Sequence, residues 1–227
     1  MGILDDVLDR TEPPAALSEH DAKRLLAEYG IPVTRELLAT SEFEATDAAA
    51  AIGYPVALKG SAVGLTHKSE EGVIRLDLRN SQELTAAYRE IEAAAARPLD
   101  GILVQEMVHG ERLLVVGLLR DNQFGPCVMF GLGGIYTEIL DDAVFRIAPL
   151  ERRNALTMME EIRGAAILGP ARGAAPADRR ALSEILITLG TLGLENERVS
   201  AVDINPLILR DDGTPVAVDA AVWLTTV

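Results

Sequence analysis

Two oxygen-bearing side chains, Asp203 and Asn205, interrupt an otherwise apolar stretch near the end of the chain, Ala201 to Leu207. Alternate side chains of an extended strand share a face, so Asp203 and Asn205 point together while Val202 and Ile204 face a core. An acid in such a stretch needs a cation. Carboxylate and amide oxygens suit Mg²⁺, which shares its remaining coordination sites with substrate phosphates. The spacing therefore predicts a metal site of the nucleotide-binding kind.

A third acid, Asp219, ends the last apolar strand, Pro215 to Val218. The turn Asp211 to Thr214 would fold this strand back onto the preceding one and bring the acids close together. A count centred on the turn pairs Asp219 with Pro206, one residue out of phase with Asn205, so we expect a bulge near Pro206. The alternative is that Asp219 caps a turn, although an acid with apolar neighbours is costly to leave unpaired.

Cationic side chains that could meet phosphates occur in and after the short apolar strand Pro55 to Lys59. The ammonium of Lys59, before the flexible stretch Gly60 to Gly64, could bind a phosphate or simply reach solvent. His67 and Lys68 follow in a loop between glycines. An imidazole can act as nucleophile or proton carrier near neutral pH. The plain alternative is a surface histidine beside a lysine.

Three glycines, Gly131, Gly133 and Gly134, join two predicted strands and would let backbone N–H groups converge on an oxyanion. A tight turn would explain them equally well. The segment is neither a dinucleotide-binding fingerprint nor a Walker loop, because no helix clearly opens after it and no Lys-Ser/Thr pair ends it. Arg146 on the next strand is a second candidate for an anion site. Its alternative salt-bridge partners are Glu138, Asp141 and Asp142.

The end of another apolar strand has the layout of a segment that binds a nucleobase. Its residues are Gln105, Glu106, Met107 and Val108, shortly before Gly110. Backbone groups there could bind the edge of an adenine while side chains cover its faces. An ordinary core position is the simpler explanation for Met107.

Capping residues and periodicity predict the elements that position these side chains. Ser18, Ser41 and Asn80 (or Ser81) are expected to begin helices. Helices are predicted at about 19–29, 42–52, 81–97, 151–162 and 176–192. Strands are predicted at about 55–59, 74–78, 101–107, 113–119, 126–130, 135–140, 144–147, 200–204 and 215–220. This order suits an α+β fold with two lobes better than one doubly wound sheet.

The composition limits the classes of function. The chain has 227 residues, 48% of them hydrophobic, and a net charge of -14, which disfavours broad contact with nucleic acid or an anionic membrane. The single cysteine, Cys127, cannot form an intrachain disulfide. The N-terminus lacks a signal-peptide pattern, and the longest aliphatic run, Leu113 to Leu119, is too short to span a bilayer. We expect a soluble cytoplasmic protein whose phosphate site is local.

In order along the chain, these segments resemble the ATP-grasp β subunit or domain of ADP-forming acyl-CoA synthetases, such as acetate–CoA ligase. The likeness covers about residues 17–224. Each segment is modest alone, but the ordered set is specific. The matching segments are Tyr29–Pro32, Pro55–Lys59, His67–Ser69, Val104–Val108, Phe124–Pro126, Phe130–Ile135, Phe145–Leu150 and Asp203–Leu207.

The resemblance implies an ATP-grasp fold, in which two α+β lobes hold a nucleotide in a cleft. Residues 1–16 would be an extension and residues 17–227 the ATP-grasp domain, with about 30–107 in its smaller lobe. His67 matches the histidine that relays phosphate in this family, and Mg²⁺ would be held by Asp203, Asn205 and Asp219. Nucleotide contacts would come from Lys59, Lys68, Gln105, Glu106, Met107 and Val108, and phosphate contacts from Gly131, Gly133, Gly134 and Arg146.

The resemblance also implies a CoA-binding α subunit as partner in a hetero-oligomer, with a second phosphohistidine. Acyl-phosphate and CoA chemistry would occur on that partner, and His67 would pass the phosphoryl group to ADP. Three positions depart from the pattern: Leu113 and Gly64 stand where an acid is common, and Val73 where a glycine is common. Two alternatives remain open: an ATP-grasp ligase that acts alone, and a non-catalytic module that senses ATP or ADP.

Overall fold

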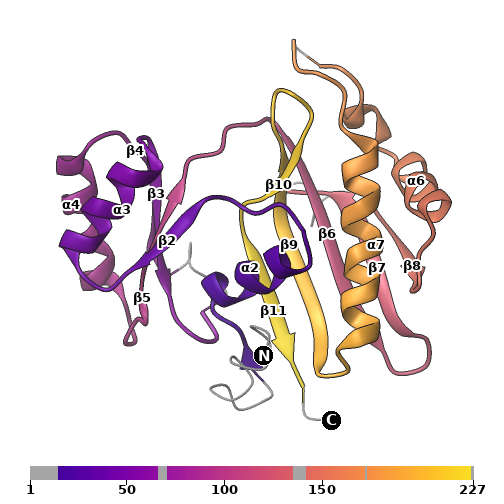
Figure 1. The fold of residues 1–227 in the computed structure, drawn as a ribbon, viewed down its shortest axis with the longest axis horizontal. Coiled ribbons are helices and arrows are strands. Elements are labelled where there is room, and N and C mark those ends of the chain that lie inside the picture. Colours follow the sequence, from indigo (N-terminus) through magenta and orange to yellow (C-terminus); the bar gives the residue numbers. More distant parts are fainter. Residues whose placement is uncertain (1–14, 66–70, 135–141, 172, 226–227) are drawn as a thin grey trace. The chain divides into compact units, whose positions relative to one another are not determined.

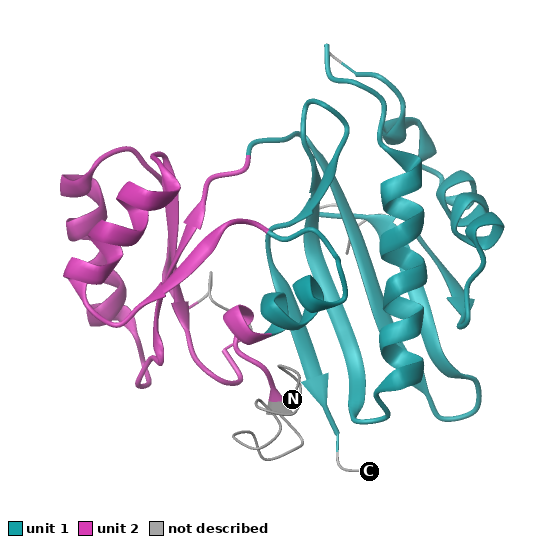
Figure 2. Ribbon diagram, in the orientation of Figure 1, with its two compact units in different colours: residues 1–15, 22–33, 109–227 teal, residues 16–21, 34–108 magenta. Residues whose placement is uncertain are grey.

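The computed structural model describes residues 15–65, 71–134, 142–171 and 173–225, which form two compact units (Figures 1 and 2). Unit 1 takes Met1–Ala15, Ala22–Val33 and His109–Val227, and unit 2 takes Ala16–Asp21 and Thr34–Val108. His67, Lys68, Glu138, Asp141 and the predicted strand 135–140 lie outside the described residues. In its described part the chain has no helix with both the length and the apolar character needed to cross a membrane.

Unit 2 is a four-stranded antiparallel sheet backed by two helices. The strand order is β2 (Glu36–Ala39), β5 (Gly101–Glu106), β3 (Val56–Ser61) and β4 (Ile74–Leu78). The helices α3 (Glu42–Ile52) and α4 (Ser81–Ala94) pack on one face, where their apolar residues meet Val56, Leu58 and Val104 in a common core (Figure 1). Because strand side chains alternate, Ala57, Lys59 and Ser61 lie on the opposite face.

The predicted helix caps are present. The Oγ of Ser41 accepts a hydrogen bond from the N–H of Glu44 at 3.2 Å, and the Oδ1 of Asn80 accepts one from the N–H of Glu83 at 2.9 Å. Gly53 ends α3 with a φ of 96°. In α2 (Glu19–Glu28), the Oγ of Ser18 accepts from the N–H of Asp21 at 3.1 Å. Local sequence therefore sets where these helices start.

Unit 1 is a larger sheet with helices on one face. Its strand order is β1 (Ala15–Ala16), β11 (Ala220–Leu224), β9 (Val199–Leu209), β6 (Arg112–Asp121), β7 (Gly125–Leu132) and β8 (Ala143–Ile147), and β10 (Pro215–Ala217) also pairs with β9. The helices α6 (Arg152–Glu161) and α7 (Arg179–Glu195) cover one face, beside the later turns of α2 (Figure 1). The Oη of Tyr29 donates to Glu195 at 3.0 Å and so joins the end of α2 to α7. A short 3₁₀ helix, Ala165–Leu168, follows α6.

The strand register decides which side chains share each face of the unit 1 sheet. Val202 of β9 lies opposite Leu118 of β6, which lies opposite Val128 of β7, and all three are buried on the helix side. The next row, Asp203, Gly117, Met129 and Phe145, therefore lies on the other face, which we call the Asp203 face. The predicted alternation along β9 is confirmed.

Several element bounds differ from the prediction. The strand β9 continues past Ile204 to Leu209, through Pro206, and α7 starts at Arg179 because the Asp178 side chain accepts from the N–H groups of Arg180 and Ala181. The predicted strand 215–220 is two strands, β10 and β11, separated by a bend. The expected α+β class is confirmed by the mixture of helices with antiparallel sheets in both units.

Candidate functional site

The predicted metal ligands of unit 1 come together on the closing strands. Ala217 pairs with Leu207 and Ala220 with Ile204, so the same register holds on both sides of the bend and places Asp219 opposite Asn205. Asp203, two residues before Asn205, shares its face. The structure therefore brings all three oxygen-bearing side chains to one region of the Asp203 face.

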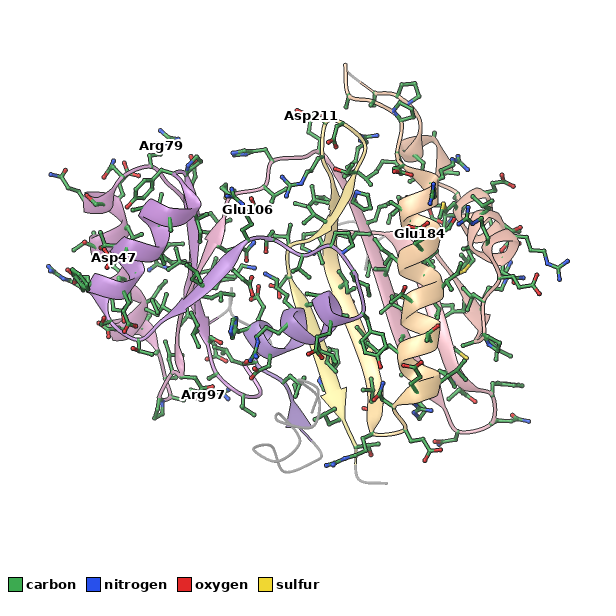
Figure 3. The ribbon with its side chains drawn as sticks, in the orientation of Figure 1. Asp47, Arg79, Arg97, Glu106, Glu184 and Asp211 are labelled. Atoms are coloured by element: carbon green, nitrogen blue, oxygen red, sulfur yellow. The ribbon has the colours of Figure 1, made fainter. Side chains whose placement is uncertain are left out.

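The route to this register differs from the predicted one. A bulge does occur at Asn205–Pro206, where these two residues oppose the single residue Val115, but it lies in the pairing of β9 with β6. The pairing of Asp219 with Asn205 is set instead by the turn that contains Asp211 (Figure 3). Pro215 pairs with Leu209, because the turn holds one residue more than the count assumed.

The electrostatics of this region favour a cation. Burial, and after it the negative charge of Asp219, raises the pKa of Asp203 to about 6. The Asp203 and Asp219 carboxylates repel each other where water is partly excluded, and a divalent ion would stabilise both in their charged form. No group of three or more His, Cys, Asp or Glu side chains is placed to hold a metal among the described residues, so the set here is two acids and one amide. That suits Mg²⁺, which takes few protein ligands and completes its shell with water and phosphate.

The glycine segment reaches the same ligands. The N–H of Gly134 donates to Oδ1 of Asn205 at 3.3 Å, and the N–H of Gly133 donates to the carbonyl oxygen of Leu113 at 2.9 Å. These two N–H groups therefore bind within the protein, whereas we expected them to converge on an oxyanion. A Cβ at Gly131 would lie 2.6 Å from the carbonyl oxygen of Asp142, so close approach of strands explains that glycine. A phosphate contact at the three glycines stays a prediction.

Arg146 is not brought to the metal ligands. It lies opposite Val128, on the helix-covered face, while its neighbour Phe145 lies on the Asp203 face. Its guanidinium binds Glu161 of α6 at 2.5 Å. The alternative partner Asp142 instead accepts hydrogen bonds from the N–H groups of residues 163 and 164, both at 2.7 Å. We expected Arg146 to contact phosphate beside this set, whereas the pleat of the strand places Arg146 on the opposite face of the sheet.

Lys59 of unit 2 does not extend to solvent. Its Nζ lies 2.7 Å from Oε1 of Glu19, in the first turn of α2, and both residues are only 4% exposed. Gln105, which is 1% exposed, lies opposite Ala57 and so on the same face of the sheet as Lys59. We refer to Glu19, Lys59 and Gln105 as the polar cluster of unit 2. Sequence reasoning missed Glu19, although an acid directly after the cap Ser18 was a visible signal.

The remaining nucleobase candidates follow Gln105 at the end of β5. The carboxylate of Glu106, which is labelled in Figure 3, accepts hydrogen bonds from the backbone N–H and the Nε of Arg35, at 3.1 and 2.9 Å. The N–H groups of Glu106 and Met107 donate to the carbonyl oxygens of Arg35 and Pro55. Val108 is buried. These bonds fix the path of the segment, and its contact with a base stays a prediction.

The described residues on either side of 66–70 are joined to neighbouring segments of unit 2. The N–H of Gly60 donates to the carbonyl oxygen of Val73 at 2.8 Å, and that of Gly64 donates to the carbonyl oxygen of Ala16 at 2.9 Å. Both bonds lie within unit 2. The residues that follow Lys59 are therefore joined to the segment that precedes Glu19.

Comparison with known proteins identifies the family. The ATP-grasp domain model matches residues 10–224. The chain is 41% identical over 213 residues to the acetate–CoA ligase (ADP-forming) I subunit beta of Pyrococcus furiosus, covering 92% of this chain and 91% of that subunit. It is 40% identical over 198 residues to acetate–CoA ligase (ADP-forming) I of Archaeoglobus fulgidus, of which it spans 29%.

Solved structures of similar proteins support the same family. The dinucleotide forming acetyl-coenzyme A synthetase 1 of Candidatus Korarchaeum cryptofilum, in complex with coenzyme A and Ca-AMPCP, superposes with a TM-score of 0.92 at 40% identity and covers 98% of both chains. A further structure of that enzyme contains Mg-AMPPCP and a phosphohistidine segment pointing towards its nucleotide-binding site. The expected ATP-grasp fold and the resemblance are both confirmed: the chain belongs to the ATP-grasp family, among the β subunits of ADP-forming acyl-CoA ligases.

Proposed function

We propose that this chain is the nucleotide-binding subunit of an ADP-forming acyl-CoA synthetase. With a CoA-binding partner subunit it would catalyse the reversible conversion of acyl-CoA, phosphate and ADP into carboxylate, CoA and ATP. The observation that carries the proposal is the meeting of Asp203, Asn205 and Asp219 on one sheet face, with the pKa of Asp203 raised to about 6 by burial and by Asp219. A divalent ion that also binds a polyphosphate would compensate the negative charges of these two neighbouring acids.

Each group has a defined chemical task. Asp203, Asn205 and Asp219 would hold Mg²⁺, which, when bound, neutralises charge on the phosphates during transfer. Lys59 would donate to phosphate oxygens, and Lys68 would add a second cation. The segment Gln105 to Val108 would bind the base, as the family resemblance implies.

His67 is proposed as the relay. A phosphoryl group carried on it by a nitrogen–phosphorus bond would pass to the terminal oxygen of ADP, so that the bond to nitrogen breaks and a phosphorus–oxygen bond forms. The electron pair of the broken bond stays on that ring nitrogen, and because the other ring nitrogen carries a proton, the histidine is left neutral and ready for the next group. This assignment is supported by the phosphohistidine segment in the Korarchaeum enzyme and by the matching His67–Ser69 segment.

The partner is supported by the lengths of the relatives. The Pyrococcus protein is a separate β subunit of about this length, whereas the Archaeoglobus ligase is one longer chain of which this sequence matches 29%. We therefore propose that the CoA site and the acyl pocket lie on an α subunit that joins this chain in a hetero-oligomer.

The experiment is phosphoryl trapping. The chain is purified with its partner, incubated with γ-³²P-ATP and Mg²⁺, and quenched in alkali, which preserves phosphohistidine. We expect label on this chain, and its loss in His67→Asn. His109→Asn is the matched control and should keep the label. Full turnover of the acyl-CoA synthetase reaction by His67→Asn would instead indicate a ligase that acts alone. If the wild-type chain forms no ATP from acyl-CoA, phosphate and ADP with a competent partner, it would be a nucleotide sensor.

A further inference from the structure

We propose that Glu19 is a positioning residue for Lys59, whose ammonium it fixes on the face of the unit 2 sheet opposite α3 and α4, for contact with the nucleotide phosphates. The inference rests on the proposed function, which assigns Lys59 to the nucleotide. Glu19 lies outside the segments that resemble the family.

The first support is the burial of the pair. Glu19 and Lys59 are each 4% exposed, and Oε1 and Nζ are 2.7 Å apart. A lysine side chain is a flexible stem that ends in a point charge, so it has no fixed geometry of its own. A buried carboxylate at this distance both compensates the charge and restricts the rotamers of the stem. Lys59 therefore has a defined position before any nucleotide arrives.

The second support is that Glu19 is itself held in place. Ser18 and Asp21 exchange two hydrogen bonds, at 3.0 and 3.1 Å, which fix the first turn of α2. The carbonyl oxygen of Ala16 accepts the N–H of Gly64 at 2.9 Å, which ties the same segment to the loop after β3. A carboxylate in the first turn is also favoured by the helix dipole. The segment that carries Glu19 is therefore held by hydrogen bonds on both sides of this residue.

The pair is compatible with phosphate binding. An ammonium has three N–H donors, so Lys59 can keep its bond to Glu19 while it donates to a phosphate oxygen. Gln105 lies on the same face of the sheet, which joins the pair to the segment proposed to bind the base. The pair lies on the face of the sheet opposite the apolar core that α3 and α4 cover.

The test is a double-mutant cycle on the full chain, with MgADP affinity measured by calorimetry. Glu19→Gln and Lys59→Met should each weaken MgADP binding by about tenfold or more, whereas adenosine, which has no phosphates, should bind each variant as it binds the wild type. In the Lys59→Met background, Glu19→Gln should change the affinity by less than about twofold, because Glu19 acts only through Lys59.

Controls separate this role from general stability. Glu42→Gln removes an exposed pair with Arg89 in the same unit and should leave MgADP affinity unchanged. Glu19→Asp keeps the charge on a shorter stem and should restore part of the affinity, which gives a second variant if Glu19→Gln unfolds. The melting temperature of each variant is also measured, so that a loss of MgADP affinity can be distinguished from a loss of stability.

Two results would overturn the proposal. Equal weakening by Glu19→Gln in both backgrounds would mean that Glu19 acts independently of Lys59. Tighter MgADP binding by Glu19→Gln would mean that Glu19 competes with the phosphates. Absence of MgADP binding by the wild-type chain would instead count against the proposed function, so the two failures are distinguishable.

Discussion

The backbone N–H of Gly134 donates a hydrogen bond to Oδ1 of Asn205 at 3.3 Å. The two residues are far apart in the sequence, and the bond orients the carboxamide of a proposed metal ligand through the main chain of the glycine segment. An amide oxygen has two lone pairs, so Asn205 can accept this N–H and still face a cation. The glycine segment thus supports the side chain of the proposed metal ligand Asn205 directly.

Replacing Gly134 should therefore impair metal-dependent binding. Gly134 has a φ of +72°, and a Cβ there would lie 2.7 Å from Cδ1 of Leu113. Gly134→Ala should cost about 1–2 kcal/mol of unfolding free energy. It should also weaken ADP binding in Mg²⁺, measured by calorimetry, by displacing Asn205. Gly125→Ala, with a φ of +75° and nothing within 4 Å, is the control for backbone strain alone. Equal affinities of the two variants would refute the link to Asn205.

The raised pKa of Asp203 predicts a pH-dependent cost to the metal-free protein. The pKa of the Asp203 carboxyl rises from its usual 3.8 to about 6 in the folded protein. The free energy of unfolding is therefore higher below about pH 4, where Asp203 is protonated, and this stability is lost as the pH rises through 6 and the buried carboxyl ionises. Two units at about 1.4 kcal/mol each give an upper limit of about 3 kcal/mol. Asp203→Asn should therefore stabilise the protein at pH 8 in EDTA, by up to this amount, and hardly at pH 4.

Urea unfolding at the two pH values measures this difference. Asp212→Asn serves as the control, because Asp212 is exposed and its pKa is lowered by hydrogen bonds with Thr214. That variant should not become more stable at pH 8. An Asp203→Asn variant less stable than the wild type at pH 8 would mean that the Asp203 carboxylate has a stabilising partner in the metal-free protein.

Arg146 provides a test of the face assignment. Because it lies on the helix side and binds Glu161 at a partly exposed position, Arg146→Gln should lower the unfolding free energy by at most about 1 kcal/mol. It should leave the MgADP affinity unchanged. A large loss of affinity with normal stability, observed in the same calorimetric titration, would mean that Arg146 reaches the phosphates after all.

The faces on which the candidate site residues of unit 1 lie could be predicted from the sequence only in part. The alternation of Asp203 and Asn205 with Val202 and Ile204 was predictable, because a strand has a fixed period of two. The side on which Arg146 lies was not, since it depends on the register across the β7–β8 connection. The pairing of Asp219 with Asn205 depended on one residue in a turn, and such counts are sensitive to turn length.

In unit 2, too, local features could be predicted from the sequence and long-range contacts could not. The capping residues Ser41 and Asn80 act within four residues, so their helices could be placed from local sequence. Glu19 and Lys59 are 40 residues apart, and only the tertiary fold brings them to 2.7 Å. The sequence alone therefore did not show that Lys59 is buried against Glu19, and the contact of Lys59 with phosphate stays a prediction.

We propose that Asp203, Asn205 and Asp219 hold the divalent ion that accompanies the nucleotide. The most direct measurement is Mn²⁺ binding by electron paramagnetic resonance, in the presence and absence of ADP, on the wild type and on Asp203→Asn, Asp219→Asn and the exposed control Asp212→Asn. We predict one ADP-dependent Mn²⁺ site per chain, weakened at least about tenfold in the first two variants and unchanged in the control. Equal Mn²⁺ affinity in the wild type and all three variants would contradict the account.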